Sequence, residues 1–222
     1  MKKINTKKIA LLSIMLALVI IFCFVPISFG TVTLALMILP VLVVAQIEDF
    51  WTTLILSILM GCVNEIAWYT TKAAAPLAPV FQNPLVCILP RMLIGVFAWC
   101  VTNGLRKLIL KDKMSANSKL AIDQIISAIS GAVGVVVNTG FVGLFTVLLF
   151  NGQVMSNGTA ISLKYILAWF GINFVIEVIA FALLTPPISL ALQKAGFSYK
   201  KVDKKAVLED TESNKEIFEE GV

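Results

Sequence analysis

The sequence predicts an all-α integral membrane protein with six transmembrane helices and cytoplasmic N- and C-termini. Hydrophobic residues make up 59% of the 222-residue chain and charged residues only 14%, whereas a soluble domain carries about a quarter charged residues. The apolar residues stand in blocks that approach or exceed the roughly 20 residues a helix needs to cross the hydrocarbon core. The basic residues gather in segments that six crossings would leave on one side.

The apolar blocks give six spans in order: residues 9–26, 31–45, 50–70, 84–108, 122–150 and 163–193. The first block follows lysines, as the core of a signal peptide does. No Ala-x-Ala-like cleavage site follows it, so we expect a retained helix. The second block is short for a full crossing, and we expect it to be tilted, broken or partly loop.

The basic residues orient these spans. They lie at the N-terminus, between the fourth and fifth spans, and in the C-terminal tail: Lys2, Lys3, Lys7 and Lys8; Arg106, Lys107, Lys111, Lys113 and Lys119; Lys194, Lys200, Lys201, Lys204, Lys205 and Lys215. The opposite side holds only Lys72 and Lys164. By the positive-inside rule both termini are cytoplasmic. The net charge of +5 is therefore a topology signal and does not indicate nucleic-acid binding.

Missing residue types exclude several functions. The chain has no histidine, which removes Ser-His proteolysis and most zinc chemistry. Its four cysteines lie in apolar spans at no metal-ligand spacing, so we expect no metal site and no disulfides. It has no Gly-x-x-x-x-Gly-Lys-[Ser/Thr] loop for binding phosphate. We therefore expect a chain that is not an enzyme and does not hydrolyse ATP itself.

Arg91 is the candidate centre of a binding site. It lies seven residues past Pro84, about 10 Å below the outer membrane boundary at a rise of about 1.5 Å per residue. An arginine inside a membrane helix costs roughly 2.5 to 3.5 kcal/mol on insertion scales and usually faces a polar site or a partner. The default hypothesis is a site for an anionic ligand. A structural ion pair with Glu65 is the alternative.

Polar and aromatic residues of neighbouring spans could surround Arg91. The third span presents Asn64, Glu65, Trp68 and Tyr69 on one side, and Asn138 lies near the middle of the fifth. Helix packing by glycines and interhelical hydrogen bonds is the alternative interpretation. Glu177 is expected near the cytoplasmic end of the last span, as a cap or in a pair with a partner chain. Residues 71–83, which include Phe81, could form a lid or an ordinary loop.

The chain resembles the substrate-binding S components of energy-coupling factor (ECF) vitamin transporters. Residues 81–95, with Asn83-Pro84-Leu85 and Leu89-Pro90-Arg91, and residues 134–140, with Asn138-Thr139, are the most specific elements. Residues 173–177 and 185–188 fit as well, and together these look like the pantothenate-type proteins. The resemblance covers nearly all of residues 1–194, which we expect to form one six-helix domain. Residues 195–222 are expected to be a charged, disordered cytoplasmic tail. Residues 45–50 depart from the family, which often has a glycine-proline turn there.

The resemblance implies a mechanism and partners. S components capture a vitamin outside the bacterial plasma membrane and associate with a transmembrane scaffold subunit and two cytoplasmic ATPases. Those partners hydrolyse ATP, and the S component binds no cofactor. In the family, small residues on the first helix contact the scaffold, a role that maps to Ala10, Ser13 and Ala17. Such residues also let any helix approach closely.

The expected ligand site follows from the same resemblance. Arg91 would meet the carboxylate of pantothenate, and the other contacts would come from Asn138, Asn64, Trp68, Tyr69 and Phe81. Cobalamin or another vitamin is an alternative substrate. A stand-alone secondary carrier is an alternative function, although no inverted repeat is evident. A membrane enzyme or scaffolding subunit is a third, and the missing catalytic motifs disfavour it.

Overall fold

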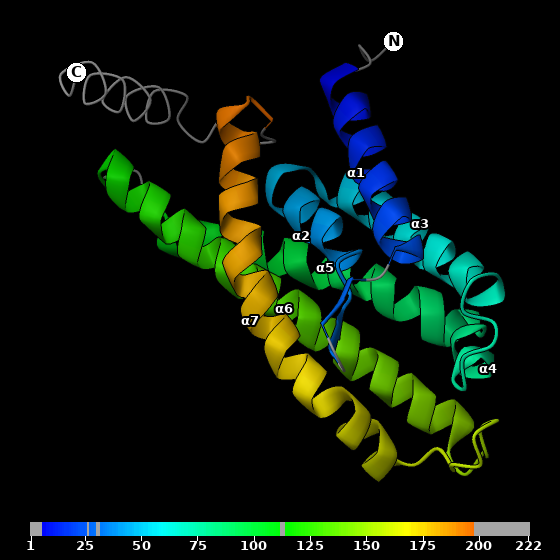
Figure 1. Cartoon of the computed structure of the whole chain (residues 1–222). Helices are drawn as coiled ribbons and strands as arrows, with labels where there is room; N and C mark the ends of the chain where they lie inside the picture. The colour runs from blue at the N-terminus through cyan, green and yellow to red at the C-terminus, as the bar shows by residue number, and fades with distance from the viewer. Residues whose placement is uncertain (1–5, 26, 30–31, 112–113, 198–222) are drawn as a thin grey trace.

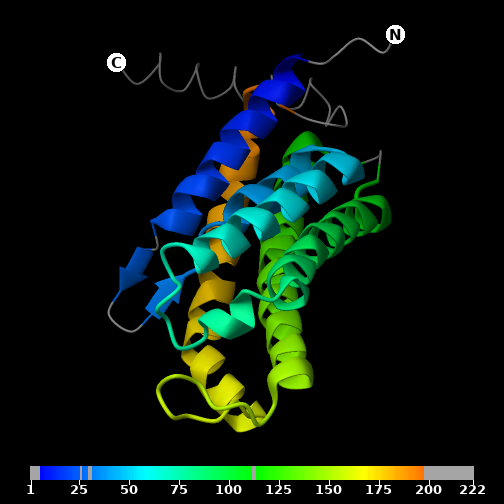
Figure 2. The ribbon, with the colours of Figure 1, turned by 90° about the vertical axis from the view of Figure 1, so that its right-hand side faces the viewer.

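Helices make up almost all of the described structure, a computed structural model that covers residues 6–25, 27–29, 32–111 and 114–197. The elements follow in the order α1 Thr6–Phe24, β1 Ile27–Phe29, β2 Val32–Leu34, α2 Ile38–Ile47, α3 Phe50–Tyr69, α4 Ala78–Phe81, α5 Pro84–Ile109, α6 Ala116–Phe150 and α7 Leu163–Lys194. In Figures 1 and 2 the start of α1 and the end of α7 lie at one end of the bundle. The loop between α6 and α7 lies at the other.

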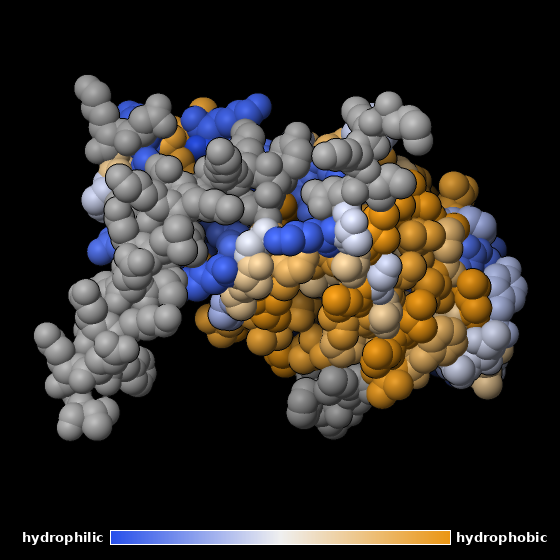
Figure 3. Space-filling model, turned by 90° about the horizontal axis from the view of Figure 1, so that it is seen from above, coloured by the Kyte–Doolittle hydropathy of each residue, from blue (hydrophilic) through white to orange (hydrophobic). Residues whose placement is uncertain are grey.

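Within these residues, five helices are long and apolar enough to cross a membrane: α1, α3, α5, residues 117–150 of α6 and residues 173–194 of α7. Their outer surfaces expose large apolar side chains such as Leu183, which is 69% exposed. Figure 3 views the molecule from the end that carries the start of α1 and shows a continuous hydrophobic flank. These helices make the chain a multi-pass membrane protein. The six-span count and the cytoplasmic orientation stay predictions.

The second predicted span, residues 31–45, is not one spanning helix. Its first residues form β2, which pairs antiparallel with β1, Ile27 opposite Leu34 and Phe29 opposite Val32. The all-α prediction is therefore wrong over this short hairpin. The ten-residue helix α2 follows and extends only about 15 Å, half the hydrocarbon thickness. Every residue of α2 except Leu39 is buried, as expected of a helix that is apolar on all sides.

Close helix contacts depend on glycine, as the packing interpretation predicts. A Cβ atom on Gly61 of α3 would lie 2.9 Å from the Cα of Ile88 on α5. One on Gly131 of α6 would lie 2.7 Å from the carbonyl oxygen of Phe181 on α7. These distances are shorter than two non-bonded carbon or oxygen atoms tolerate. The glycines therefore set the spacing of two helix pairs.

A polar network ties α2, α5, α6 and α7 together at the end that carries the start of α1. Arg106 on α5 donates to both carboxylate oxygens of Asp123 on α6, at 2.6 and 3.0 Å. It also donates to the carbonyl oxygen of Gln46, at 2.6 Å. Ser127 bonds both Gln46 and Ser189. We call these residues, with Gln193 bound to Asp123, the Arg106 network.

The acidic pair at the turn between α2 and α3 is not simply solvated. Lys8 of α1 makes a salt bridge to Asp49 and lies 3.6 Å from the Glu48 carboxylate. Thr52 also donates to Asp49. Burial alone would raise the pKa of Asp49, but the bonds from Lys8 and Thr52 outweigh it and hold that pKa below its ordinary value. Sequence reasoning missed this pairing because Lys8 and Asp49 are 41 residues apart.

Candidate binding site

Arg91 is buried inside the bundle, 4% exposed, and its position depends on the proline before it. Pro90 lies inside α5 and has no N–H to donate to the carbonyl oxygen of Val86. The Arg91 Nη1 donates to that oxygen instead, at 2.9 Å. The Arg91 Nε finds no hydrogen-bond partner among the described residues. The Pro-Arg pair thus holds a guanidinium in the interior with a donor still available.

Aromatic rings cover the guanidinium. Its Cζ lies 5.6 Å from the ring centroid of Phe81 on α4, within the range of a cation–π contact. Trp68 of α3 stacks on Phe81, with centroids 4.5 Å apart and planes 8° from parallel. The Nζ of Lys72 lies 5.4 Å from the Trp68 ring centroid. Two cations therefore flank one aromatic pair.

Residues 71–83, which we call the lid segment, pack onto the bundle. Gln82 donates to the Trp68 carbonyl oxygen at 3.1 Å, and the Tyr69 hydroxyl donates to the Gln82 carbonyl oxygen at 3.0 Å. Leu77, Val80 and Phe81 are buried together with Val86 of α5 and Val142 of α6. The segment is thus an ordered cover over Arg91. Whether it opens as a lid stays a prediction.

The two predicted asparagines are both buried and each keeps an unbonded oxygen. Asn64 donates to the Cys87 sulfur at 3.2 Å. The Oδ1 atoms of Asn64 and of Asn138 have no hydrogen-bond partner within the described part of the chain. Cys87 lies one helical turn before Arg91 on α5, so Asn64 bonds a residue on the same side of α5 as Arg91. Asn138 lies on α6, and the structure describes no contact between it and Arg91.

Glu177 lies deeper than the sequence predicted. It is 7% exposed, and its Oε1 accepts from the backbone N–H of Ala35 at 2.9 Å. Its charge acts on Arg91. The prediction of a cytoplasmic cap or a partner-chain contact is therefore wrong. Glu177 lies near the midpoint of α7, and it also lies near the midpoint of the predicted span 163–193, so the prediction misjudged its depth and not the length of the helix.

The proposed ion pair between Arg91 and Glu65 is not formed. The salt bridges among the described residues join Lys8 to Glu48 and Asp49, and Arg106 to Asp123. Glu65 is half-exposed and is not among the charges that act on Arg91. The one carboxylate that does act on Arg91, Glu177, is already engaged by a backbone N–H.

Lys72 is the residue that sequence reasoning missed. Burial lowers its pKa below the ordinary value for lysine, and the positive charge of Arg91 acts in the same direction. The sequence did contain one indication of a role for Lys72, because it is one of only two basic residues on the predicted outer side. We call Asn64, Trp68, Lys72, Phe81, Cys87 and Arg91 the Arg91 cluster. Tyr69 lies at its edge and is 59% exposed.

The predicted partner face on α1 points away from the bundle. Ala10, Ser13 and Ala17 are exposed, while Leu11, Met15 and Val19 on the opposite side of the helix are buried. The spacing of Trp169, Asn173 and Glu177 in the sequence predicts that they share one side of the last span. The side chain of Trp169 lies outside the described part of the structure.

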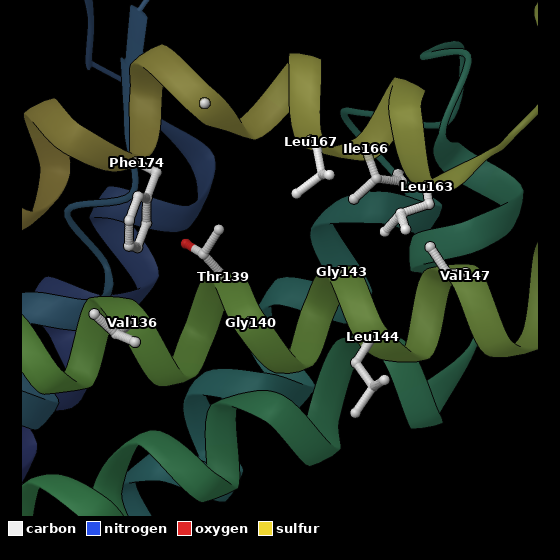
Figure 4. Close-up of a pocket in the computed structure, with 11 residues that line it drawn as sticks. Val136, Thr139, Gly140, Gly143, Leu144, Val147, Leu163, Ile166, Leu167 and Phe174 are labelled. Carbon is white, nitrogen blue, oxygen red and sulfur yellow. The ribbon is translucent and has the colours of Figure 1, made fainter.

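An apolar groove of about 610 Å³ runs between α6 and α7. In Figure 4, Thr139 of α6 and Phe174 of α7 point toward each other across it, and Leu167 points toward α6. Glycines 140, 143 and 171 contribute to its lining. None of the predicted site residues lines this groove. Its exposed leucines suit contact with lipid chains, so the candidate polar site is the Arg91 cluster.

No family model and no curated protein matches the sequence. A solved structure of ThiT from Listeria monocytogenes is similar, with a TM-score of 0.58 over 90% of this chain and 97% of that one. The two sequences are 17% identical over this match. This chain has the ThiT fold. At this identity the likeness establishes the architecture, and the chemistry of the site depends on the side chains described above.

Proposed function

We propose that the chain is the vitamin-binding S component of an ECF transporter and that the Arg91 cluster binds the anionic group of its ligand. The observation that carries this is the buried Arg91 Nε, which has no acceptor among the residues that the structure describes. A buried donor left unbonded costs roughly 1 to 3 kcal/mol, and more when it is charged. Such a cost is retained where function requires it, and a ligand carboxylate would supply the missing acceptor.

The ThiT fold supports the proposal that this chain is an S component. At 17% identity the shared fold carries no ligand over to this chain. Pantothenate is our specific proposal, taken from the motifs around Arg91 and Asn138. Its carboxylate would meet the guanidinium, and Asn138 and Asn64 would bond its amide or hydroxyl groups. Trp68, Tyr69 and Phe81 would supply apolar contact.

The proposed partners are a transmembrane scaffold subunit and two cytoplasmic ATPases. The exposed small side chains of Ala10, Ser13 and Ala17 support contact with a scaffold helix, because small residues let helix backbones approach closely in a membrane. Purification of the tagged chain from its native membrane should recover all three partners. Trp at both Ser13 and Ala17 should release them and leave ligand binding unchanged.

Ligand binding is tested with an acid and its alcohol. The wild-type chain should prefer pantothenate to pantothenol, and Arg91→Gln should lose that preference by about tenfold or more, the value of a charge-assisted hydrogen bond. Glu65→Gln is the matched control and should keep the preference. A folded Arg91→Gln variant that still prefers the acid would show that the carboxylate assignment is wrong.

Energy coupling separates the proposal from a stand-alone carrier. Liposomes that contain only this chain should bind the ligand without concentrating it, since the sequence has no phosphate-binding loop. Adding the partners and ATP should start accumulation. Accumulation driven by an ion gradient alone would contradict the S-component assignment.

A further inference from the structure

The Arg91 cluster has a charge balance that Arg91 alone does not explain. Glu177 is buried, and its charge acts on Arg91. These two residues together are close to neutral. Glu65 acts on Cys87 but not on Arg91 or Lys72, and because its carboxylate is half-exposed, water screens its charge. If no other charge contributed, a site with one cation and one carboxylate would have little reason to prefer an anionic ligand.

Lys72 supplies the second cation. It lies in the lid segment, half-buried, on the outer side of the aromatic pair that covers Arg91. The structure describes no carboxylate within salt-bridge distance of it. Lys72 lies 5.4 Å from the Trp68 ring centroid and Arg91 lies 5.6 Å from the Phe81 ring centroid, so both cations contact the same stacked aromatic pair.

We propose that Lys72 is the residue that makes the site selective for singly charged organic anions. This inference rests on the proposed function, in that it concerns the same site. Arg91 and Lys72 contribute two positive charges and Glu177 one negative charge, which leaves one positive charge for the ligand to balance. The contact with Trp68 holds the Lys72 ammonium group beside the cluster in the packed position of the lid segment.

Thiol labelling measures this charge without knowledge of the ligand. Cys87 bonds Asn64 inside the cluster and is buried. In a full-length chain with Cys23, Cys62 and Cys100 replaced by Ala, it is the single thiol. We would compare its labelling rates with anionic 2-sulfonatoethyl and cationic 2-(trimethylammonio)ethyl methanethiosulfonate. The ratio of the two rates within one variant cancels changes in access and in thiol ionisation.

The anionic reagent should react faster than the cationic one. Lys72→Gln should lower the ratio of the anionic to the cationic labelling rate by about tenfold, because it removes a unit positive charge near the thiol. Lys72→Arg should restore the ratio. Lys164→Gln is the matched control, because Lys164 is an exposed lysine at the start of α7 on the same predicted side. That variant should leave the ratio unchanged. Glu177→Gln should raise it.

An unchanged ratio in Lys72→Gln would overturn the inference. So would a Cys87 that reacts with neither reagent even in Phe81→Ala, since the lid segment would then not be what covers the site. Neither result depends on pantothenate. A chain that labels as expected but fails to bind pantothenate would leave Lys72 in its role and refute only the proposed substrate.

Discussion

Arg91 and Arg106 lie on the same helix, about 22 Å apart along it, but their guanidinium groups differ in how fully they are hydrogen-bonded. Each of the three guanidinium nitrogens of Arg106 donates a hydrogen bond, two of them to Asp123. Arg91 donates to one backbone carbonyl and keeps its Nε unbonded among the described residues. Arg106 is a structural tie between helices, whereas Arg91 keeps one donor without an acceptor in the described part of the chain.

Breaking the Arg106 network should have the largest effect on stability. Asp123→Asn leaves the Arg106 guanidinium without its carboxylate, and we expect a loss of roughly 3 kcal/mol, at the lower end for a buried pair. The lower end applies because 17% of the Arg106 side chain is exposed. Thermal unfolding in detergent measures it. Replacing both Arg106 and Asp123 by Leu should recover part of the loss. No recovery would argue against an unpaired charge as the cause.

Glycine substitutions test how tightly α5 is packed near each arginine. Gly61→Ala forces α3 away from Ile88, three residues before Arg91, and should cost about 1 to 3 kcal/mol. A methyl group added to Gly104, two residues before Arg106, would meet no atom of a neighbouring element within 4 Å. Gly104→Ala should therefore be neutral or gain up to about 1 kcal/mol from helix propensity. Equal losses in the two variants would contradict this difference in packing.

The salt bridge between Lys8 and Asp49 should contribute less, because both side chains are partly exposed. Asp49→Asn should cost about 0 to 1 kcal/mol. The pKa of Asp49 is lowered in the folded chain, so its contribution is present above the ordinary pKa and is lost as the pH falls through the lowered one. Melting curves of both proteins should therefore differ at neutral pH and converge only below about pH 4. Convergence at higher pH would refute the lowered pKa.

Arg91→Gln should have the smallest effect on stability, although it should abolish selective ligand binding. The variant removes a buried charge that lacks a full set of partners, and its amide can still donate to the Val86 carbonyl oxygen. Without ligand, its melting temperature should equal or exceed that of the wild-type chain. A loss as large as that of Asp123→Asn would show that Arg91, like Arg106, is chiefly structural.

The sequence predicted those parts of the fold that depend on local composition. Four predicted spans correspond to α1, α3, α5 and α7 within a few residues, because each apolar block is long enough to form a spanning helix by itself. The fifth, α6, begins earlier than predicted, at Ala116, where Ser115 caps the helix in a polar stretch that hydropathy does not detect. The second block, expected to be tilted, broken or partly loop, is broken into a hairpin strand and a short buried helix.

By itself the sequence determined that the protein is a bundle of membrane helices and that Arg91 lies among them, because hydrophobicity and span length are properties of consecutive residues. Only the tertiary structure decided which charges meet. It buried Glu177 at a position from which its charge acts on Arg91, left Glu65 without a salt bridge to Arg91, and brought Lys72 onto the aromatic pair. Electrostatic and stacking contacts act over a few ångströms in space. Residues that are far apart in the sequence come within that distance only when the helices pack.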